Sequence, residues 1–286
     1  MLHDAPFGRL LASVPALAAR TKGHFVIAHG RAPGYAADAT SYPEGDYAML
    51  TAIAWASLII AGGSALLIAI DEMRHPQKMW TMNLVWPITA LYFSVVAVWG
   101  YFTIGRRMAR GEGGSMKESH VASSSAPMEM PHDHREKPKW TAVAVSSSHC
   151  GAGCVLADIL CEYLVFALGL ALFGQSIYAS YVIDLIVAWL FGIVFQYFMI
   201  QPMKQLPPVA ALKAAIQADT LSILSFQVGM YAWMAVVYFV LWPHPHLKPN
   251  QPAFWFMMQI AMIFGFFTTY PMNRWLVQSG IKESMG

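Results

Sequence analysis

The chain has 286 residues, of which 57% are hydrophobic and only 12% are charged, and its formal net charge is +2. This composition is too apolar and too poor in charge for an ordinary soluble domain. The small net charge provides no basis for nucleic-acid binding. The composition therefore predicts an integral membrane protein.

Six apolar stretches are long enough to cross a membrane, since about 20 helical residues span a hydrocarbon core of roughly 30 Å. The predicted spans cover residues 47–70, 79–104, 152–174, 181–201, 221–242 and 253–272. The predicted fold class is an all-α, polytopic helical membrane protein with about six transmembrane helices. The Ala-rich segment 207–220 is predicted to lie along the cytoplasmic face before the fifth span.

Lys and Arg residues predict the orientation, because the cytoplasmic loops of membrane proteins are enriched in them. With the N-terminus in the cytoplasm, every Lys and Arg residue except Arg74, Lys78 and Lys248 falls on the cytoplasmic side. The opposite orientation would place almost all of them outside. The sequence therefore predicts an inner (plasma) membrane protein with both termini in the cytoplasm.

A change of composition after the second span predicts how the chain is organised. Residues 105–139 are rich in Gly, Ser, Pro, Met and charge, and such a segment buries too little apolar surface to order itself. We expect a cytoplasmic N-terminal arm at 1–46, a two-helix transmembrane hairpin at 47–104, and a flexible cytoplasmic linker at 105–139. A four-helix transmembrane domain follows at 140–286.

The run SSSHCGAGCVLADILCEY, Ser146 to Tyr163, holds all three cysteines of the chain. Residues spaced by four share one face of a helix, and Cys, Asp and Glu side chains recur at that spacing here. The serines at the start of the run are predicted helix N-caps. The predicted topology places His149 and Cys150 at the cytoplasmic mouth of the third span.

Thiolate, imidazole and carboxylate groups together suit zinc best, with iron, nickel or copper as alternatives. The predicted metal ligands are His149, Cys150, Cys154, Asp158 and Asp219. The alternative is that the cysteines are small buried apolar residues with no metal. Asp219, like Asp184, stands near a predicted helix end, where capping accounts for a carboxylate equally well.

Glu162 falls near the middle of the third span, where an ionisable side chain costs several kcal/mol unless it faces a cavity, a partner or an ion. Many aromatic residues also fall at mid-membrane depth. Aromatic rings that face inward hold an alkylammonium ion by cation–π attraction, worth roughly 2 kcal/mol per desolvated contact. The candidate substrate-binding residues are Trp86, Tyr92, Phe93, Glu162, Tyr163, Phe166, Trp189, Tyr231, Trp233 and Phe264.

Three motifs carry a resemblance to a known family: HCGAGC with the following Asp158, QADTLSILSFQVGMY from Gln217 to Tyr231, and YPMNRWLVQSGIKESM near the end of the chain. Over roughly residues 140–286 the chain resembles the bacterial trimethylamine transporter family. The resemblance implies a homotrimer of helical protomers. It also implies an amine held by aromatic rings midway across the membrane and a metal ion near the cytoplasmic face.

The predicted function is transport of a small methylated amine, trimethylamine in its protonated form, with a structural or regulatory metal. An enzyme is not predicted, because the sequence has no Ser/His/Asp arrangement, phosphate loop or dinucleotide fingerprint. The alternative is a membrane protein that transports or handles copper or zinc, in which the 18 Met residues and the His-containing linker supply the Cys cluster. The predicted partners are the amine, the lipid bilayer and further copies of the chain.

Overall fold

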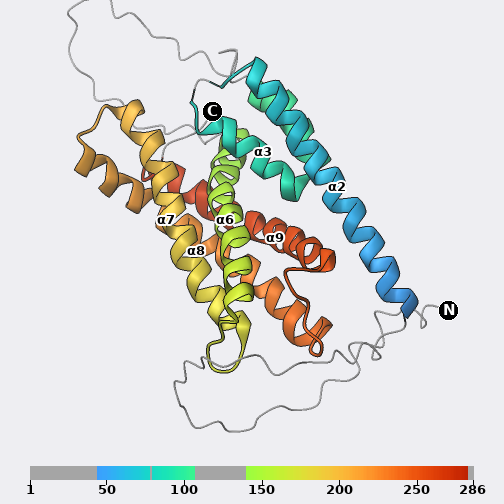
Figure 1. The fold of residues 1–286 in the computed structure, drawn as a ribbon. Helices are drawn as coiled ribbons and strands as arrows, with labels where there is room; N and C mark the ends of the chain where they lie inside the picture. Colours follow the sequence, from blue (N-terminus) through green and yellow to red (C-terminus); the bar gives the residue numbers. More distant parts are fainter. Residues whose placement is uncertain (1–43, 78, 107–139, 283–286) are drawn as a thin grey trace, which may run out of the picture.

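The computed structural model describes residues 44–77, 79–106 and 140–282 (Figure 1). Within this part the fold is all-α, and five helices are long and apolar enough to cross a membrane. These are α2 (Glu44–Arg74), α6 (Trp140–Leu168), α7 (Ser176–Lys204), α8 (Pro208–Val236) and α9 (Pro252–Gln278). A π-helical turn, η3 (Val237–Leu241), extends α8. The predicted fold class, a polytopic helical membrane protein, is confirmed.

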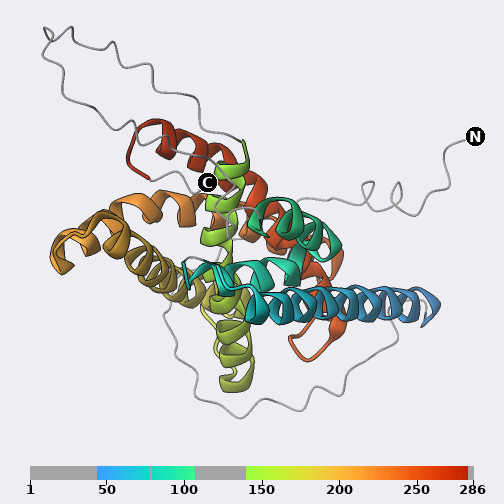
Figure 2. The ribbon, with the colours of Figure 1, turned by 90° about the horizontal axis from the view of Figure 1, so that it is seen from above.

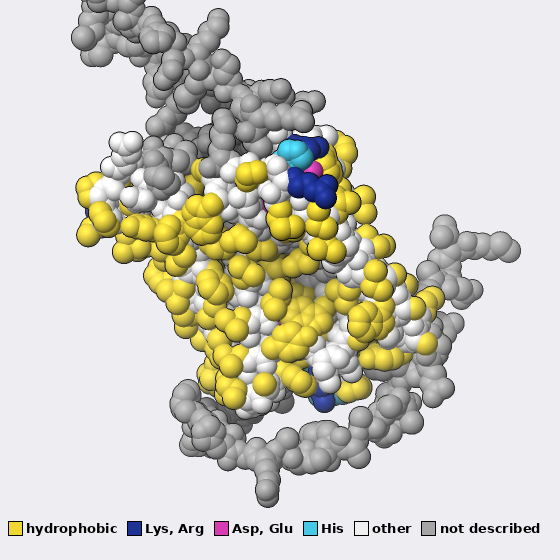
Figure 3. Space-filling model, turned by 45° about the horizontal axis from the view of Figure 1, so that its top comes forward, with side chains coloured by type: hydrophobic (Ala, Val, Ile, Leu, Met, Phe, Trp, Pro, Cys, Tyr) yellow, Lys and Arg dark blue, Asp and Glu magenta, His cyan; other side chains and the backbone are white. Residues whose placement is uncertain are grey.

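The face drawn in Figure 3 is mostly hydrophobic; a group of charged side chains lies toward its top, and a further Lys or Arg side chain lies at its lower edge. At the end of α2, Arg106 and His75 both contact Asp71, at 3.3 and 3.4 Å. Elsewhere large apolar side chains point outward, as Ile59 and Leu66 do on α2. Lipid acyl chains solvate apolar side chains. A surface of this kind therefore avoids the free-energy cost of exposure to water when lipid covers it.

The second predicted span is a helical hairpin. It consists of α3 (Met82–Phe93), α4 (Val95–Gly100) and the π-helical turn η2 (Tyr101–Gly105). Ser94 separates α3 from α4 with a φ of 48°, a left-handed value that ends the helix. The chain then folds back, so that Trp86 packs against Tyr101 with ring centroids 5.8 Å apart.

The end of this hairpin returns to the end of α2. The hydroxyl of Tyr101 donates a hydrogen bond to Asp71, at 2.8 Å. The segment 79–104 therefore enters and leaves the bundle at the same end, and does not cross it as the sequence predicted. Apolar composition cannot reveal such a turn, because a hairpin buried between helices is as hydrophobic as a spanning helix.

One fewer crossing changes the predicted topology. We call the two ends of the bundle the Trp140 end and the Leu168 end, after the two ends of α6. Arg74, Arg106 and Lys282 lie at the Trp140 end, and α2 begins at the Leu168 end (Figure 1). With five crossings, Glu44 and Lys282 lie on opposite sides of the membrane, and the positive-inside rule predicts that the Trp140 end is the cytoplasmic one. Residues 1–43 are outside the described residues.

Helix α6 lies in the middle of the bundle and contacts α3, α7, α8 and α9 (Figures 1 and 2). It begins at Trp140, three turns before the predicted span. Gly153 allows its close contact with α7, since a Cβ atom there would lie 3.3 Å from the backbone nitrogen of Gly192. Helix α8 likewise begins at Pro208, so the segment predicted to lie on the membrane surface is the first part of α8.

Candidate functional site

The Ser146–Tyr163 run lies inside α6 and does not begin it. Ser147 donates its hydroxyl to the carbonyl of Val143, at 2.9 Å, and it is fully buried. The N-cap prediction is therefore wrong, because the apolar residues before the run continue the helix. Cys154 stands at the middle of the 29 residues of α6, so the cluster is within the membrane.

Polar side chains from α6, α7 and α8 meet in the half of the bundle nearer the Leu168 end. We call Asp158, Glu162, Asp184, Gln227 and Tyr231 the acidic cluster. Asp184 accepts hydrogen bonds from the Gln227 amide and the Tyr231 hydroxyl, both at 2.9 Å. The carboxyl groups of Asp158 and Asp184 lie close to each other.

The acidic cluster has unused hydrogen-bonding capacity. Asp158 and Asp184 are 1% and 2% exposed, and Oδ2 of Asp158 and Oδ1 of Asp184 contact no hydrogen-bonding partner in the described chain. Glu162 is half-buried and accepts a hydrogen bond from Ser180, at 3.1 Å. In the described residues, no Lys, Arg or His forms an ion pair with these three carboxyl groups.

Two tyrosines border the acidic cluster. The rings of Tyr181 and Tyr231 stack with centroids 4.0 Å apart. The Tyr181 hydroxyl donates to the backbone carbonyl of Tyr231, at 2.6 Å. The single proton of the Tyr231 hydroxyl is shared between Asp184 and the backbone carbonyl of Tyr181, which lies 2.8 Å away, and these contacts hold α7 and α8 together. Neither Tyr181 nor Asp184 was among the predicted binding residues. Asp184 lies near a predicted helix end, and in the sequence alone that position is equally consistent with capping.

The ten predicted binding residues lie in several different places in the structure. Glu162 and Tyr231 belong to the acidic cluster. Tyr163, Phe166 and Phe264 are 48%, 42% and 44% exposed on the described surface. The others take part in separate contacts: Trp86 with Tyr101, Tyr92 with Phe93, Phe93 with Phe266, Trp189 with Thr220, and Trp233 with Phe264.

A second polar group lies nearer the Trp140 end, between α6, α8 and α9. We call Ser147, Asp219, Ser222, Asn273 and Lys282 the lysine cluster. The Lys282 ammonium donates to Asp219 at 2.8 Å and to Ser222 at 3.1 Å. Ser222 in turn donates to Asn273 at 2.5 Å, and the Asn273 amide donates to Ser147 at 3.0 Å.

The predicted metal ligands are divided between these surroundings. Cys150 and Cys154 contact each other, whereas the His149 ring lies beside Phe195, with centroids 5.9 Å apart. Asp219 pairs with Lys282. In the residues that the structure describes, no three His, Cys, Asp or Glu side chains are placed to hold a metal ion.

The imidazole of His149 and the thiols of Cys150 and Cys154 are nevertheless side chains that zinc prefers as ligands. His149 is 1% exposed, and neither ring nitrogen contacts a hydrogen-bonding partner in the described residues. A buried imidazole in that state is available as a ligand, and two thiols lie within the next turn and a half of α6. Zinc binding by these residues stays a prediction. It requires the His149 ring to turn toward the thiols.

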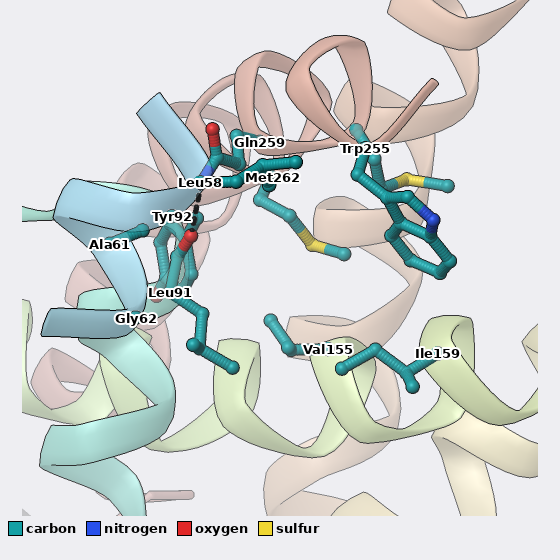
Figure 4. Close-up of a pocket in the computed structure, with 11 residues that line it drawn as sticks. Leu58, Ala61, Gly62, Leu91, Tyr92, Val155, Ile159, Trp255, Gln259 and Met262 are labelled. Carbon is teal, nitrogen blue, oxygen red and sulfur yellow. Dashed lines mark hydrogen bonds between the residues drawn. The ribbon is translucent and has the colours of Figure 1, made fainter. Parts of the chain in front are cut away.

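An apolar pocket of about 170 Å³ lies between α2, α3, α6 and α9 (Figure 4). In Figure 4, Trp255 stands on one side of the pocket, and Val155 and Ile159 of α6 form its floor. The Gln259 amide is already paired, donating to the carbonyl of Leu91 and accepting from Ser57, both at 2.7 Å. The pocket therefore presents mainly carbon and sulfur atoms. Tyr92 is the predicted binding residue that borders it.

The fold and the buried carboxyl groups define a polytopic helical membrane protein with ionisable side chains inside its bundle. Residues 139–282 match the family described as "Domain of unknown function (DUF4396)", and the chain belongs to this family. The match covers α6 to α9 and so includes both polar clusters. No curated protein and no solved structure matches the chain.

Proposed function

We propose that this protein is a transporter that carries a small methylated amine, protonated trimethylamine, across the inner membrane between α6, α7 and α8. The observation that carries the proposal is the Asp158–Asp184 pair, buried at membrane depth with free oxygens and no cation paired to it in the described residues. Buried carboxylates of this kind mark ion and substrate paths. The family resemblance described above supports an amine as the cation.

The surroundings of the pair suit an alkylammonium ion. Tyr231 and Tyr181 stack on each other beside the carboxyl groups, so each ring keeps one outer face that the other does not cover. A methylated cation gains from cation–π contact with such a face in a desolvated site. Ammonium ion is more strongly hydrated and needs several hydrogen-bond acceptors, so it loses more than trimethylamine on entering. Glu162 lies nearer the Leu168 end and receives the cation first.

Phe226, Cys150 and Cys154 lie between the acidic cluster and the lysine cluster. All three side chains are at most 1% exposed. A ligand that moves from one cluster to the other must therefore displace packed side chains. In this proposal the protein alternates between states in which one cluster or the other is open, and it catalyses no chemical reaction.

Uptake into proteoliposomes tests the function. Purified protein is reconstituted and supplied with labelled trimethylamine, with protein-free liposomes as the control. We expect saturable uptake that tetramethylammonium inhibits and ammonium does not. Uptake no faster than in protein-free liposomes would sink the proposal.

The aromatic contact is tested by two changes at Tyr231. Tyr231→Phe keeps the ring but removes the hydroxyl that donates to Asp184, whereas Tyr231→Ala removes both. We expect Tyr231→Phe to retain most uptake and Tyr231→Ala to raise the KM about tenfold, the equivalent of roughly 1.4 kcal/mol of cation–π attraction. Equal losses in the two variants would show that the hydroxyl, and not the ring, binds the amine.

The proposed metal is zinc, held by His149, Cys150 and Cys154, whereas Asp158 and Asp219, the other two predicted ligands, lie in the acidic cluster and the lysine cluster. We expect about one zinc ion per chain in wild-type protein and almost none in Cys150→Ser/Cys154→Ser, since thiolates are the strongest zinc ligands of the set. Mass spectrometry of metal content in purified samples checks this. Cys161→Ser is the matched control, because it removes a buried cysteine outside the predicted site.

Homotrimer formation, implied by the resemblance, is also proposed, and native mass spectrometry of the purified protein tests it.

The second candidate function is transport of copper or zinc. The unpartnered His149 nitrogens, on the same helix as the thiols of Cys150 and Cys154, favour it. Metal transport is distinguished from amine transport in proteoliposomes. Metal transport predicts that copper or zinc crosses the membrane and that trimethylamine is not taken up.

A further inference from the structure

Lys282 is a cation sealed inside a membrane protein. Its side chain is 0% exposed, and so is that of Asp219, the carboxylate that it contacts. A buried lysine loses its hydration and the freedom of a long side chain, so its position needs an explanation. The proposed transport mechanism does not use it.

The backbone after α9 brings this lysine into the bundle. Gly280 has a φ of 70°, a value that glycine adopts without strain, and it ends the helix. The backbone amides of Ile281 and Lys282 then both donate to the carbonyl of Leu276, at 3.1 and 3.2 Å. This turn reverses the chain, and the side chain of Lys282 enters between α8 and α9.

The groups around the ammonium form a site built for a cation. Asp219 supplies the charge and Ser222 a neutral oxygen. Ser222 is oriented by Asn273, which also binds Ser147 of α6, so three helices contribute to the site. Oδ2 of Asp219 is buried and contacts no partner in the described residues, which leaves an acceptor for a further N–H group.

We infer that Asp219 and Ser222 form an alkylammonium-binding site at the Trp140 end of the bundle, and that Lys282 is its resident occupant. The chemical group that Lys282 places there is an ammonium on an alkyl chain, the same class as a protonated amine. If the protein transports amines as proposed above, an amine that leaves toward the Trp140 end must displace Lys282. Lys282 then acts as a tethered competitor that keeps this end closed when no amine is present.

The site itself is tested without transport. Lys282→Ala removes the ammonium and its alkyl stem, and n-propylammonium is the probe that replaces them. We expect n-propylammonium to raise the Tm of Lys282→Ala by several degrees in a saturable manner, since a ligand that binds only the folded state stabilises it. Sodium at equal ionic strength is the salt control. No shift, or an equal shift in Lys282→Ala/Asp219→Asn, overturns the site.

Displacement is tested by uptake. We expect Lys282→Ala to take up labelled trimethylamine severalfold faster than wild type, and n-propylammonium to slow the variant much more than wild type. Equal rates and equal inhibition would overturn the competitor role. If wild type takes up no trimethylamine, the proposed function fails and displacement with it, while the Tm result still decides whether Asp219 binds an alkylammonium ion.

A measurement on the unmodified sequence covers the case in which Lys282→Ala does not fold. An amine-acylating reagent reacts with exposed lysines, and mass spectrometry locates the modified ones. Lys213 is exposed on α8 and serves as the internal reference. We expect Lys282 to be protected relative to Lys213, and saturating trimethylamine to raise its modification severalfold. Modification of Lys282 that is equal with and without trimethylamine contradicts displacement.

Discussion

Replacing both aspartates of the acidic cluster, in Asp158→Asn/Asp184→Asn, is expected to reduce trimethylamine uptake at least 100-fold. The amide keeps the size of the carboxyl group and its capacity to accept from Gln227 and Tyr231, but it removes the charge that balances the ammonium ion. Loss of a buried charge partner costs about 2–5 kcal/mol. A 100-fold drop in kcat/KM corresponds to about 2.7 kcal/mol. Proteoliposome uptake at several amine concentrations gives kcat/KM for the variant and for wild type.

The control for this variant separates binding from folding. Ser180→Ala removes the hydroxyl that donates to Glu162 and leaves every carboxyl group in place. We expect it to retain most uptake. The double Asn variant should keep a Tm close to that of wild type, because both side chains still pair. Full uptake by the double Asn variant would contradict the proposed path between α6, α7 and α8.

Two alanine substitutions of glycine are expected to differ in their effect on stability, because only one of them introduces a clash. A Cβ atom at Gly229 of α8 would lie 2.4 Å from Oγ1 of Thr268 and 2.7 Å from the backbone oxygen of Phe264 on α9. Helix α9 must move away to admit it, and overpacking of this kind costs typically 1–3 kcal/mol. We expect Gly229→Ala to lower the Tm and to reduce uptake, since both polar clusters include residues of α8.

Gly63→Ala is the matched control, because it makes the same chemical change at an open position. Gly63 lies on α2, and no atom would lie within 4 Å of its added Cβ. Alanine is favoured over glycine in a helix interior by about 1 kcal/mol. The Tm of this variant should equal or exceed that of wild type. Equal Tm values for the two variants would show that α8 and α9 are not closely packed at Gly229.

The sequence predicted the helical membrane fold well and its second span poorly. Length and hydropathy decide whether a helix enters a bilayer, so α2, α6, α7, α8 and α9 were visible in the composition. The break at Ser94 was not, because a left-handed serine has no distinctive neighbours in the sequence. That single dihedral angle turns a predicted crossing into a hairpin and moves the start of α2 to the other side of the membrane.

The candidate site was predicted in part for a similar reason. Spacing by four placed Cys154, Asp158 and Glu162 on one face of a helix, and the structure has Cys154 and Asp158 buried and Glu162 half-buried on that face. Spacing within one helix does not show which residue of another helix lies opposite. Asp184, 26 residues after Asp158 in the sequence, became its neighbour only through the contact between α6 and α7.

The sequence by itself determined that this chain is a polytopic helical membrane protein with a carboxyl group, that of Glu162, near the middle of a span. Only the tertiary structure decided that Asp158 meets Asp184, that Lys282 pairs with Asp219, and that the predicted aromatic residues occupy separate places. The physical reason is that burial in a bilayer depends on the local composition of each segment. The partner of a buried polar group depends on how the helices pack against one another.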